Sequence, residues 1–173
     1  MKNIRNWMLF AMVLLFFDVH IGIVNLLPNW AAYLILAYCA KKMMAEKGGL
    51  TAALGICATV LQIIFFFFQT DNALLTWLFS GIFWTMEMLL FYGLATGILQ
   101  LQEKEGLWIR RKILLMLYAI SIVACGMALN VRPMFILAGV MMFCARLYFL
   151  FGLWRLIPKE EQTEPEEEKE EIL

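Results

Sequence analysis

Long apolar runs separated by short polar breaks dominate the chain. The runs cover residues 6–27, 28–45, 50–69, 73–99, 107–129 and 133–157. A helix that crosses the roughly 30 Å of bilayer hydrocarbon needs about 20 residues, and the last four runs meet that length. The first two form one stretch broken only at "NLLPN", where Pro28 suits the first turn of a new helix. The pattern predicts an all-α integral membrane bundle of six transmembrane helices.

Composition strengthens the membrane assignment. Of the 173 residues, 63% are hydrophobic and 16% are charged. A soluble domain carries about 45–50% apolar and about 25% charged residues. An excess of this size cannot be buried in one water-soluble core, so part of it must face the lipid bilayer. We therefore expect a multi-pass protein of the cell membrane.

Charge divides the chain into two parts. Residues 158–173 contain eight glutamates and two lysines, whereas residues 1–157 contain twelve basic and six acidic residues. The tail has almost no apolar content before Ile172, so it cannot bury enough surface to fold alone. We predict a six-helix transmembrane domain over 1–157 and an acidic, disordered tail over 158–173. The tail either stays solvated or docks to a basic partner.

The basic residues set the predicted orientation. With the N-terminus inside, twelve of the fourteen lysines and arginines fall in cytoplasmic ends or loops. Of the other two, Arg132 lies in an outer loop and Arg146 within a span. Lysine and arginine accumulate on the cytoplasmic side of membrane proteins. Both termini, and the acidic tail, are therefore expected in the cytoplasm.

The three predicted outer turns resemble one another. They read "NLLPNW" from Asn25, "NALLTW" from Asn72 and "NVRPMF" from Asn130. This likeness favours three similar helical hairpins. It has a second explanation, because Asn in a turn, Pro at a helix start and an aromatic residue at the membrane interface suit any outer hairpin. Even as true repeats, the hairpins would share one orientation, unlike the inverted repeats of many transporters.

Two charged residues, Glu87 and Arg146, lie near the middle of predicted spans. Glu87 follows Ala73 by fourteen residues and Arg146 follows Pro133 by thirteen, so both are expected about 20 Å below the outer surface. An unpaired charge at such depth costs about 2.5–3.5 kcal/mol, which predicts an intramembrane ion pair. The pair is either a structural staple between two helices or part of a substrate or proton pathway. Alternatively, Arg146 snorkels to the cytoplasmic interface.

The fourth apolar run carries two further features. Thr76, Ser80 and Glu87 follow one another at helical spacings of four and seven, with Trp84 between the last two, so one helix face is polar and aromatic. Farther along, Gly93 and Gly97 are four residues apart, a spacing that permits close helix packing.

The polar residues of the first run, in "FFDVHIGIVN", have two interpretations. Asp18 and His20 are two residues apart, so on a helix they would point to different sides. A first helix that ends near Asp18 resolves this, with residues 19–27 as an outer loop or re-entrant turn whose polar groups cap exposed backbone. The functional alternative is a binding site at the outer face, formed by Asp18, His20, Asn25 and Trp30.

The segment "FDVHIGIVNLLPNWAAYLILAY", from Phe17 to Tyr38, carries an aspartate, an "LLP" turn and then a tyrosine. These residues are Asp18, Leu26, Leu27, Pro28 and Tyr33. In this order they resemble the first hairpin of a group of small, uncharacterised membrane proteins common in low-GC Gram-positive bacteria. That group often has phenylalanine in place of Trp30 and aspartate in place of Asn29. The resemblance covers about 22 residues and brings no known activity.

The sequence carries no catalytic motif. There is no HExxH, no serine motif with a matching histidine, no pair of intramembrane aspartates and no glycine-rich phosphate loop. The four cysteines lie in apolar stretches without a CxxC pair, and one histidine cannot complete a metal cluster. We expect no enzyme activity, no cofactor, no metal and no nucleic-acid partner.

Two functional hypotheses remain. The first is a non-catalytic accessory or regulatory subunit that docks to a larger membrane protein. The second is a small-solute binding or transport protein, similar in size and hydropathy to the substrate-binding components of energy-coupling-factor vitamin transporters. The alanine-rich docking motif on the first helix of those components is missing, since "WAAYLILAYCA" lies in the second run. A small-molecule ligand is therefore expected only under the second hypothesis.

Overall fold

The computed structural model describes residues 2–16, 20–21, 24–25, 29–44, 48–67, 72–101, 108–128 and 130–157. This part of the chain forms six α-helices, as the apolar runs predict. They are α1 (Lys2–Phe16), α2 (Asn29–Met44), α3 (Gly49–Phe67), α4 (Ala73–Gln100), α5 (Trp108–Met127) and α6 (Pro133–Tyr148). The last helix continues through a π-helical segment, η3 (Phe149–Leu153), and a 3-10 turn, η4 (Trp154–Leu156).

The first helix is short. It ends at Phe16, although the first apolar run extends to residue 27. Two short strands follow, β1 (His20–Ile21) and β2 (Val24–Asn25), which pair antiparallel with His20 opposite Asn25. The backbone polar groups at these residues are thus paired between strands instead of within a helix. This agrees with the interpretation of a first helix that ends near Asp18, a residue that itself lies outside the described part of the chain.

Local sequence explains where the later helices begin. The side chain of Asn72 accepts hydrogen bonds from the backbone N–H groups of Leu74 and Leu75, at 3.0 and 3.3 Å, and so caps α4. Pro133 occupies the first turn of α6, where its missing N–H leaves no bond unmade. The three asparagines of the predicted repeat therefore differ in structure. Asn25 lies in a strand, Asn72 caps a helix and Asn130 lies in a turn.

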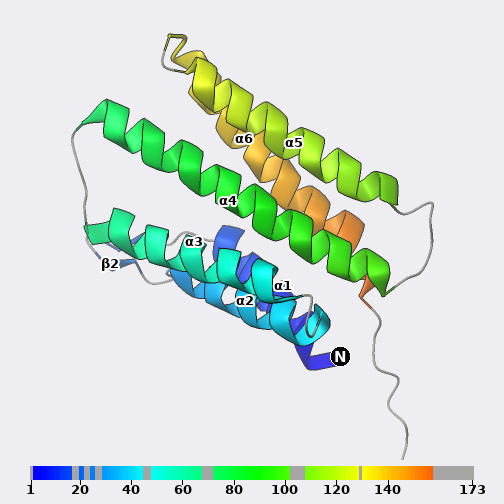
Figure 1. The fold of residues 1–173 in the computed structure, drawn as a ribbon. Helices are drawn as coiled ribbons and strands as arrows, with labels where there is room; N and C mark the ends of the chain where they lie inside the picture. The colour runs from blue at the N-terminus through cyan, green and yellow to red at the C-terminus, as the bar shows by residue number, and fades with distance from the viewer. Residues whose placement is uncertain are drawn as a thin grey trace, which may run out of the picture.

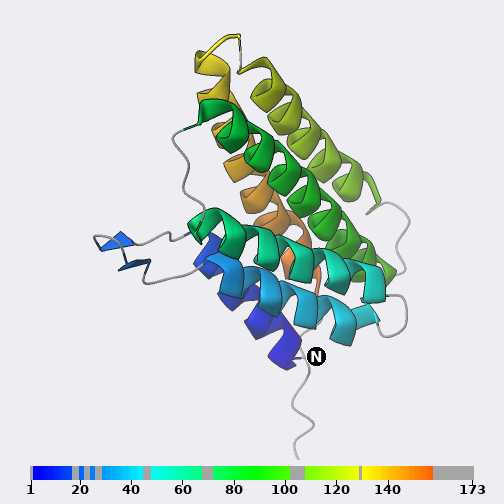
Figure 2. The same ribbon diagram turned by 60° about the vertical axis from the view of Figure 1, so that its left-hand side comes forward.

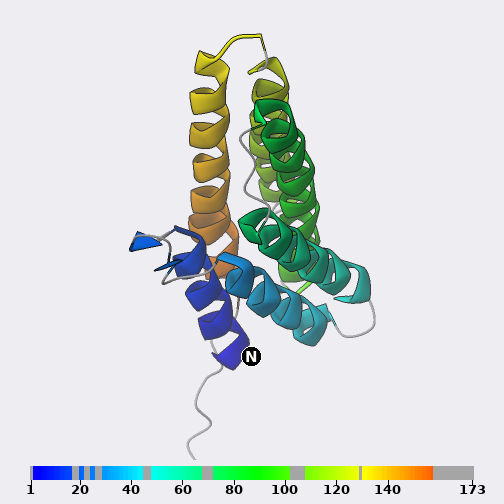
Figure 3. The ribbon, with the colours of Figure 1, turned by 90° about the vertical axis from the view of Figure 1, so that its left-hand side faces the viewer.

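The helices form two groups of unequal length (Figure 1). Helices α4, α5 and α6 are long and run side by side, whereas α1, α2 and α3 cover one end of them only (Figures 2 and 3). Two hydrogen bonds between α1 and the last helix show how far along that helix the shorter group extends. The start of α1 meets η4, where Trp154 Nε1 donates to the Arg5 carbonyl at 2.9 Å. The end of α1 meets Arg146, whose Nη1 donates to the Leu15 carbonyl at 3.1 Å. Helix α6 extends beyond this point to Pro133.

The main apolar core lies at the end of the bundle where both groups meet. On α4, Leu90, Phe91, Leu94, Ile98 and Leu99 are almost fully buried, and most of the other buried members of this core come from α1 and α2. At the other end, the buried cluster consists of Ala124, Cys125 and Ala138, with Trp77 and Trp84 packed against it. The bundle is therefore tightly packed at one end and sparsely packed at the other.

Two of the described helices are long and apolar enough to cross a membrane, namely Leu74–Gln100 and Pro133–Leu156. The apolar parts of α1 and α3 are shorter. The six full spans expected from the apolar runs therefore remain a prediction beyond these two helices. In α3 the apolar part is Gly49–Phe65, and α5 opens with three successive basic residues, Arg110, Arg111 and Lys112.

Candidate functional site

Glu87 and Arg146 meet in the middle of the bundle. Arg146 Nε lies 2.7 Å from Glu87 Oε1, and Nη2 lies 2.8 Å from Oε2. This is the bidentate geometry in which a guanidinium matches a carboxylate. The Glu87 side chain is fully buried, whereas that of Arg146 is 19% exposed. Arg146 therefore pairs with α4 and does not snorkel to the cytoplasmic interface.

Two tyrosines complete the surroundings of the Glu87 carboxylate. The Tyr33 hydroxyl donates to Oε2 at 2.8 Å, and the Tyr118 hydroxyl donates to Oε1 at 3.0 Å. Both tyrosines are fully buried. Each carboxylate oxygen thus receives one bond from Arg146 and one from a phenol. A carboxylate with this many donors keeps its charge stabilised away from water.

The network joins five of the six helices. It contains Leu15 from α1, Tyr33 from α2, Glu87 from α4, Tyr118 from α5 and Arg146 from α6. The sequence pointed to the two charges because an unpaired charge at membrane depth is costly. It did not single out Tyr118, and Tyr33 entered only through the family resemblance. A buried tyrosine needs a partner for its hydroxyl, and that signal would have suggested both.

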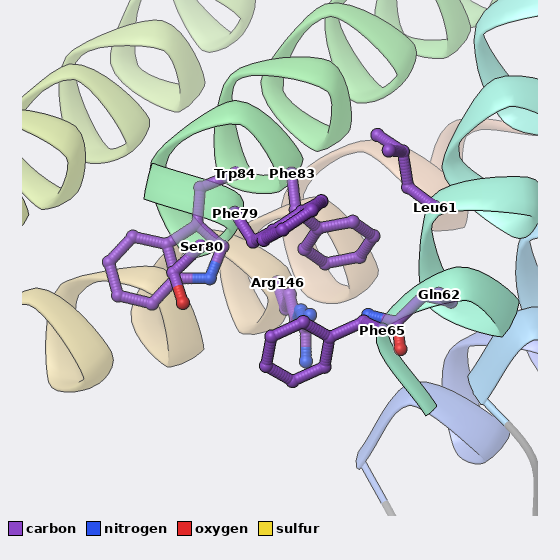
Figure 4. Close-up of a pocket in the computed structure, with 8 residues that line it drawn as sticks. All are labelled: Leu61, Gln62, Phe65, Phe79, Ser80, Phe83, Trp84 and Arg146. Atoms are coloured by element: carbon purple, nitrogen blue, oxygen red, sulfur yellow. The ribbon is translucent and has the colours of Figure 1, made fainter. Parts of the chain in front are cut away.

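A cavity of about 210 Å3 lies against the exposed edge of Arg146. Its walls are mostly aromatic: Phe65 of α3 faces Phe79, Phe83 and Trp84 of α4, and the guanidinium points between them (Figure 4). Leu61, Gln62 and Ser80 complete the lining. The polar and aromatic face predicted for the fourth helix is thus split. Ser80 and Trp84 line the cavity, while Glu87 lies in the network next to it.

The predicted outer-face site is only partly described. Asp18 lies outside the described residues, and for His20 and Asn25 the structure gives backbone positions only. Trp30 lies in the first turn of α2, is 38% exposed, and its carbonyl accepts a bond from Thr59 Oγ1 at 3.2 Å. Beside it, the buried Oδ1 of Asn29 accepts no hydrogen bond from the described residues.

The two glycines predicted for helix packing lie at close helix contacts. A methyl group added at Gly93 would overlap the side chain of Thr51 on α3, and one added at Gly97 would come within 2.6 Å of the Met44 sulfur on α2. These glycines therefore let α4 approach the N-terminal helices closely. In the described part of the chain, no group of three metal-ligating side chains comes together.

No family model, no curated protein and no solved structure matches the chain. Function must therefore be argued from the network and the cavity themselves.

Proposed function

We propose that this chain is a multi-pass protein of the cell membrane with both termini in the cytoplasm. The contact between Arg5 and Trp154 supports this, because it brings the first and last helical turns to the same end of the bundle. Basic residues gather at that end as well, from the last turn of α2 to the first turn of α5. An excess of basic residues is typical of the cytoplasmic side.

Helix lengths refine the proposed topology. Helix α1 spans about 22 Å and α2 about 24 Å, whereas α4 spans about 42 Å. The end of α1 lies beside Arg146, which is in the last turn of α6 and near the middle of the continuous helix Pro133–Leu156. We therefore propose that α3 to α6 cross the bilayer and that the hairpin of α1 and α2 reaches the depth of Arg146 and returns. This replaces the six full crossings expected from the apolar runs and keeps both termini inside.

The topology can be tested by labelling from outside the cell. In a background with all four cysteines changed to alanine, single cysteines at Asn25, Asn72 and Asn130 are exposed to a membrane-impermeant maleimide. We expect Asn72→Cys and Asn130→Cys to react rapidly and Asn25→Cys to react only after the membrane is opened. Rapid reaction at all three positions would restore six full crossings.

Within this topology, we propose that the protein acts without catalysis, as an accessory component of a larger membrane assembly. The observation that supports this is the network that ties five helices together at one point. A carrier alternates between two packings of its helices. In this chain such a change would separate a buried charge pair, at a cost of about 3–5 kcal/mol. A rigid body held in this way suits a docking or regulatory subunit.

The test is purification of the tagged full chain from its native membrane in mild detergent, followed by mass spectrometry of the proteins that accompany it. We expect a membrane partner at stoichiometric amount. The matched control is a chain that lacks residues 160–173, which shows whether the acidic tail carries the interaction. Recovery of the protein alone, under conditions that keep it folded, would contradict the accessory role.

Small-solute binding is the second candidate, and the cavity beside Arg146 favours it. The resemblance of the first hairpin to the uncharacterised membrane proteins of low-GC Gram-positive bacteria is compatible with either role. We propose that relationship on the Asp18, "LLP" and Tyr33 pattern alone.

A further inference from the structure

The cavity beside Arg146 combines an apolar wall with unused hydrogen-bonding capacity. A guanidinium has five N–H donors. Four of those of Arg146 are engaged, by the two oxygens of Glu87, the Tyr33 hydroxyl and the Leu15 carbonyl. The fifth, on Nη1, has no acceptor among the described residues. The Gln62 side chain, also on the cavity wall, likewise makes no hydrogen bond to a described residue.

The size and shape of the cavity limit what fits. An engineered protein cavity of ~150 Å3 holds benzene, so about 210 Å3 admits one ring with a small substituent. Phe65, Phe79, Phe83 and Trp84 supply faces and edges against which a ring packs favourably. An occupant that packs against these rings gains dispersion contacts with them.

Charge decides which substituent is favoured. Glu87 already balances Arg146, so the network carries no net charge toward the cavity. An anionic ligand would bring an uncompensated negative charge to this depth, which is costly. A purely apolar occupant, such as a lipid acyl chain, would leave the free N–H of Arg146 without a partner. A neutral molecule with an oxygen acceptor satisfies both requirements.

We propose that this cavity binds a neutral ring compound that carries a carbonyl-type oxygen, with the oxygen accepting from Arg146 Nη1 and the ring among the four aromatic side chains. Trp30, the one residue of the predicted outer-face site whose side chain is described, is not among the residues that line this cavity. The proposed site also stands independently of the accessory role, because a docking subunit can carry a ligand site or lack one.

Three fluorinated probes of similar size test the proposal by 19F NMR on the purified full chain in detergent. They are 4-fluoroacetophenone, 4-fluoroethylbenzene and 4-fluorobenzoate, which are a neutral acceptor, a hydrocarbon and an anion. A bound resonance that saturates distinguishes the site from partition into micelles. We expect the ketone to bind at least about tenfold more tightly than the other two, as a hydrogen bond to a charged donor implies.

Two variants fill the cavity from opposite walls, and one leaves it open. Ser80→Leu and Leu61→Trp are expected to abolish the saturable ketone signal, whereas Gly139→Leu adds bulk where nothing lies within 4 Å and is expected to retain it. An unchanged thermal midpoint in either cavity variant shows that the loss comes from the filled cavity.

Each other outcome overturns the proposal in a different way. Equal binding of the ketone and the hydrocarbon would make the cavity an apolar or lipid-chain site. Tighter binding of the benzoate would make it an anion site. Absence of saturable binding, or binding that survives both Ser80→Leu and Leu61→Trp, would remove the site altogether. None of these results bears on whether a protein partner copurifies, so the two proposals fail independently.

Discussion

The two ends of the bundle are built differently. At the packed end, which includes residues 87–100 of α4, all six helices contribute to one apolar core. At the open end, which includes residues 73–86 of α4 and 133–145 of α6, the α1–α3 group reaches only the inner part (Figure 3), through contacts such as Phe16 with Phe143 and Phe65 with Phe79. Most large apolar side chains of these two segments are exposed. Helix α4 takes part in both ends. The same apolar composition thus forms a protein core in one half and an exposed surface in the other.

The polar network and the cavity lie at the boundary between these ends. The network joins α1 and α2 to the long helices at the level where the short helices stop. Immediately beyond this level, the cavity occupies space between the end of α3 and the longer α4. The short helices α1–α3 therefore stabilise one end of the bundle, and the cavity lies where these helices end. The following substitutions test that division.

The largest effect is expected from breaking the ion pair. Glu87→Gln or Arg146→Gln leaves one buried charge without its partner, which lowers the free energy of unfolding by about 3–5 kcal/mol. The double variant removes both charges, so most of that loss is expected to be recovered. Unfolding in detergent with increasing denaturant measures all three. The control is Arg132→Gln, at an exposed position of the open end, which should change stability by less than about 0.5 kcal/mol.

Losses that simply add in the double variant would show that Glu87 and Arg146 do not stabilise each other. The network would then not be what holds the two helix groups together. The proposal of an accessory role, which depends on a rigid bundle, would lose its support.

The next largest loss of stability is expected when a buried apolar side chain of α4 is shortened, and an exposed one on the same helix provides the comparison. Leu94, at the packed end, is fully buried, whereas Ile82, at the open end, is 53% exposed. We expect Leu94→Ala to cost about 2–5 kcal/mol because it leaves a cavity, and Ile82→Ala to cost less than about 0.5 kcal/mol. The same unfolding measurement applies. A similar loss at both positions would mean that a second copy or a retained partner covers the open end in detergent.

A smaller effect is expected at the glycines of α4. Gly93→Ala forces its new methyl group into Thr51 on α3, so we expect a loss of about 1–3 kcal/mol. Gly81 lies on the same helix at the open end, where an added methyl group meets nothing within 4 Å. Gly81→Ala should therefore cost nothing measurable. Equal tolerance at both glycines would show that α3 and α4 are not closely packed.

Much of this organisation could be predicted from the sequence, and the reasons for the rest are physical. Apolar runs predicted the six helices because each run is bounded by polar turn residues. The rule that a charge at membrane depth needs a partner pointed to Glu87 and Arg146, and the structure brings these two together. Glycine spacing pointed to Gly93 and Gly97, but not to their partners on α3 and α2, because a partner depends on the tertiary arrangement.

Other features depend on relations between distant segments. Polar residues predicted that the first helix ends near Asp18, but not that this end lies beside Arg146, because a contact between distant segments depends on the tertiary arrangement. The cavity escaped prediction for a similar reason, since it exists only where the end of α3 meets the middle of α4. Similarity among the three outer turns was misleading in one respect. Lys41 and Arg146 each follow the proline of their turn, Pro28 or Pro133, by thirteen residues. Lys41 is nevertheless exposed, whereas Arg146 is paired with Glu87.

The smallest predicted effect concerns the cap of α4 at the open end. Asn72→Ala removes the acceptor for the N–H groups of Leu74 and Leu75, which costs about 1 kcal/mol where a cap stabilises the whole fold. If the open end is less stable than the packed end, the first turn of α4 can unfold locally while the packed end stays folded. We therefore expect faster hydrogen exchange at Leu74 and Leu75 and unchanged exchange at Leu94. Arg132→Ala is the matched control, because the Arg132 side chain makes no capping bond at the start of α6. Faster exchange at Leu94 as well would show that the two ends unfold as one unit, and the division between them would then be one of packing alone.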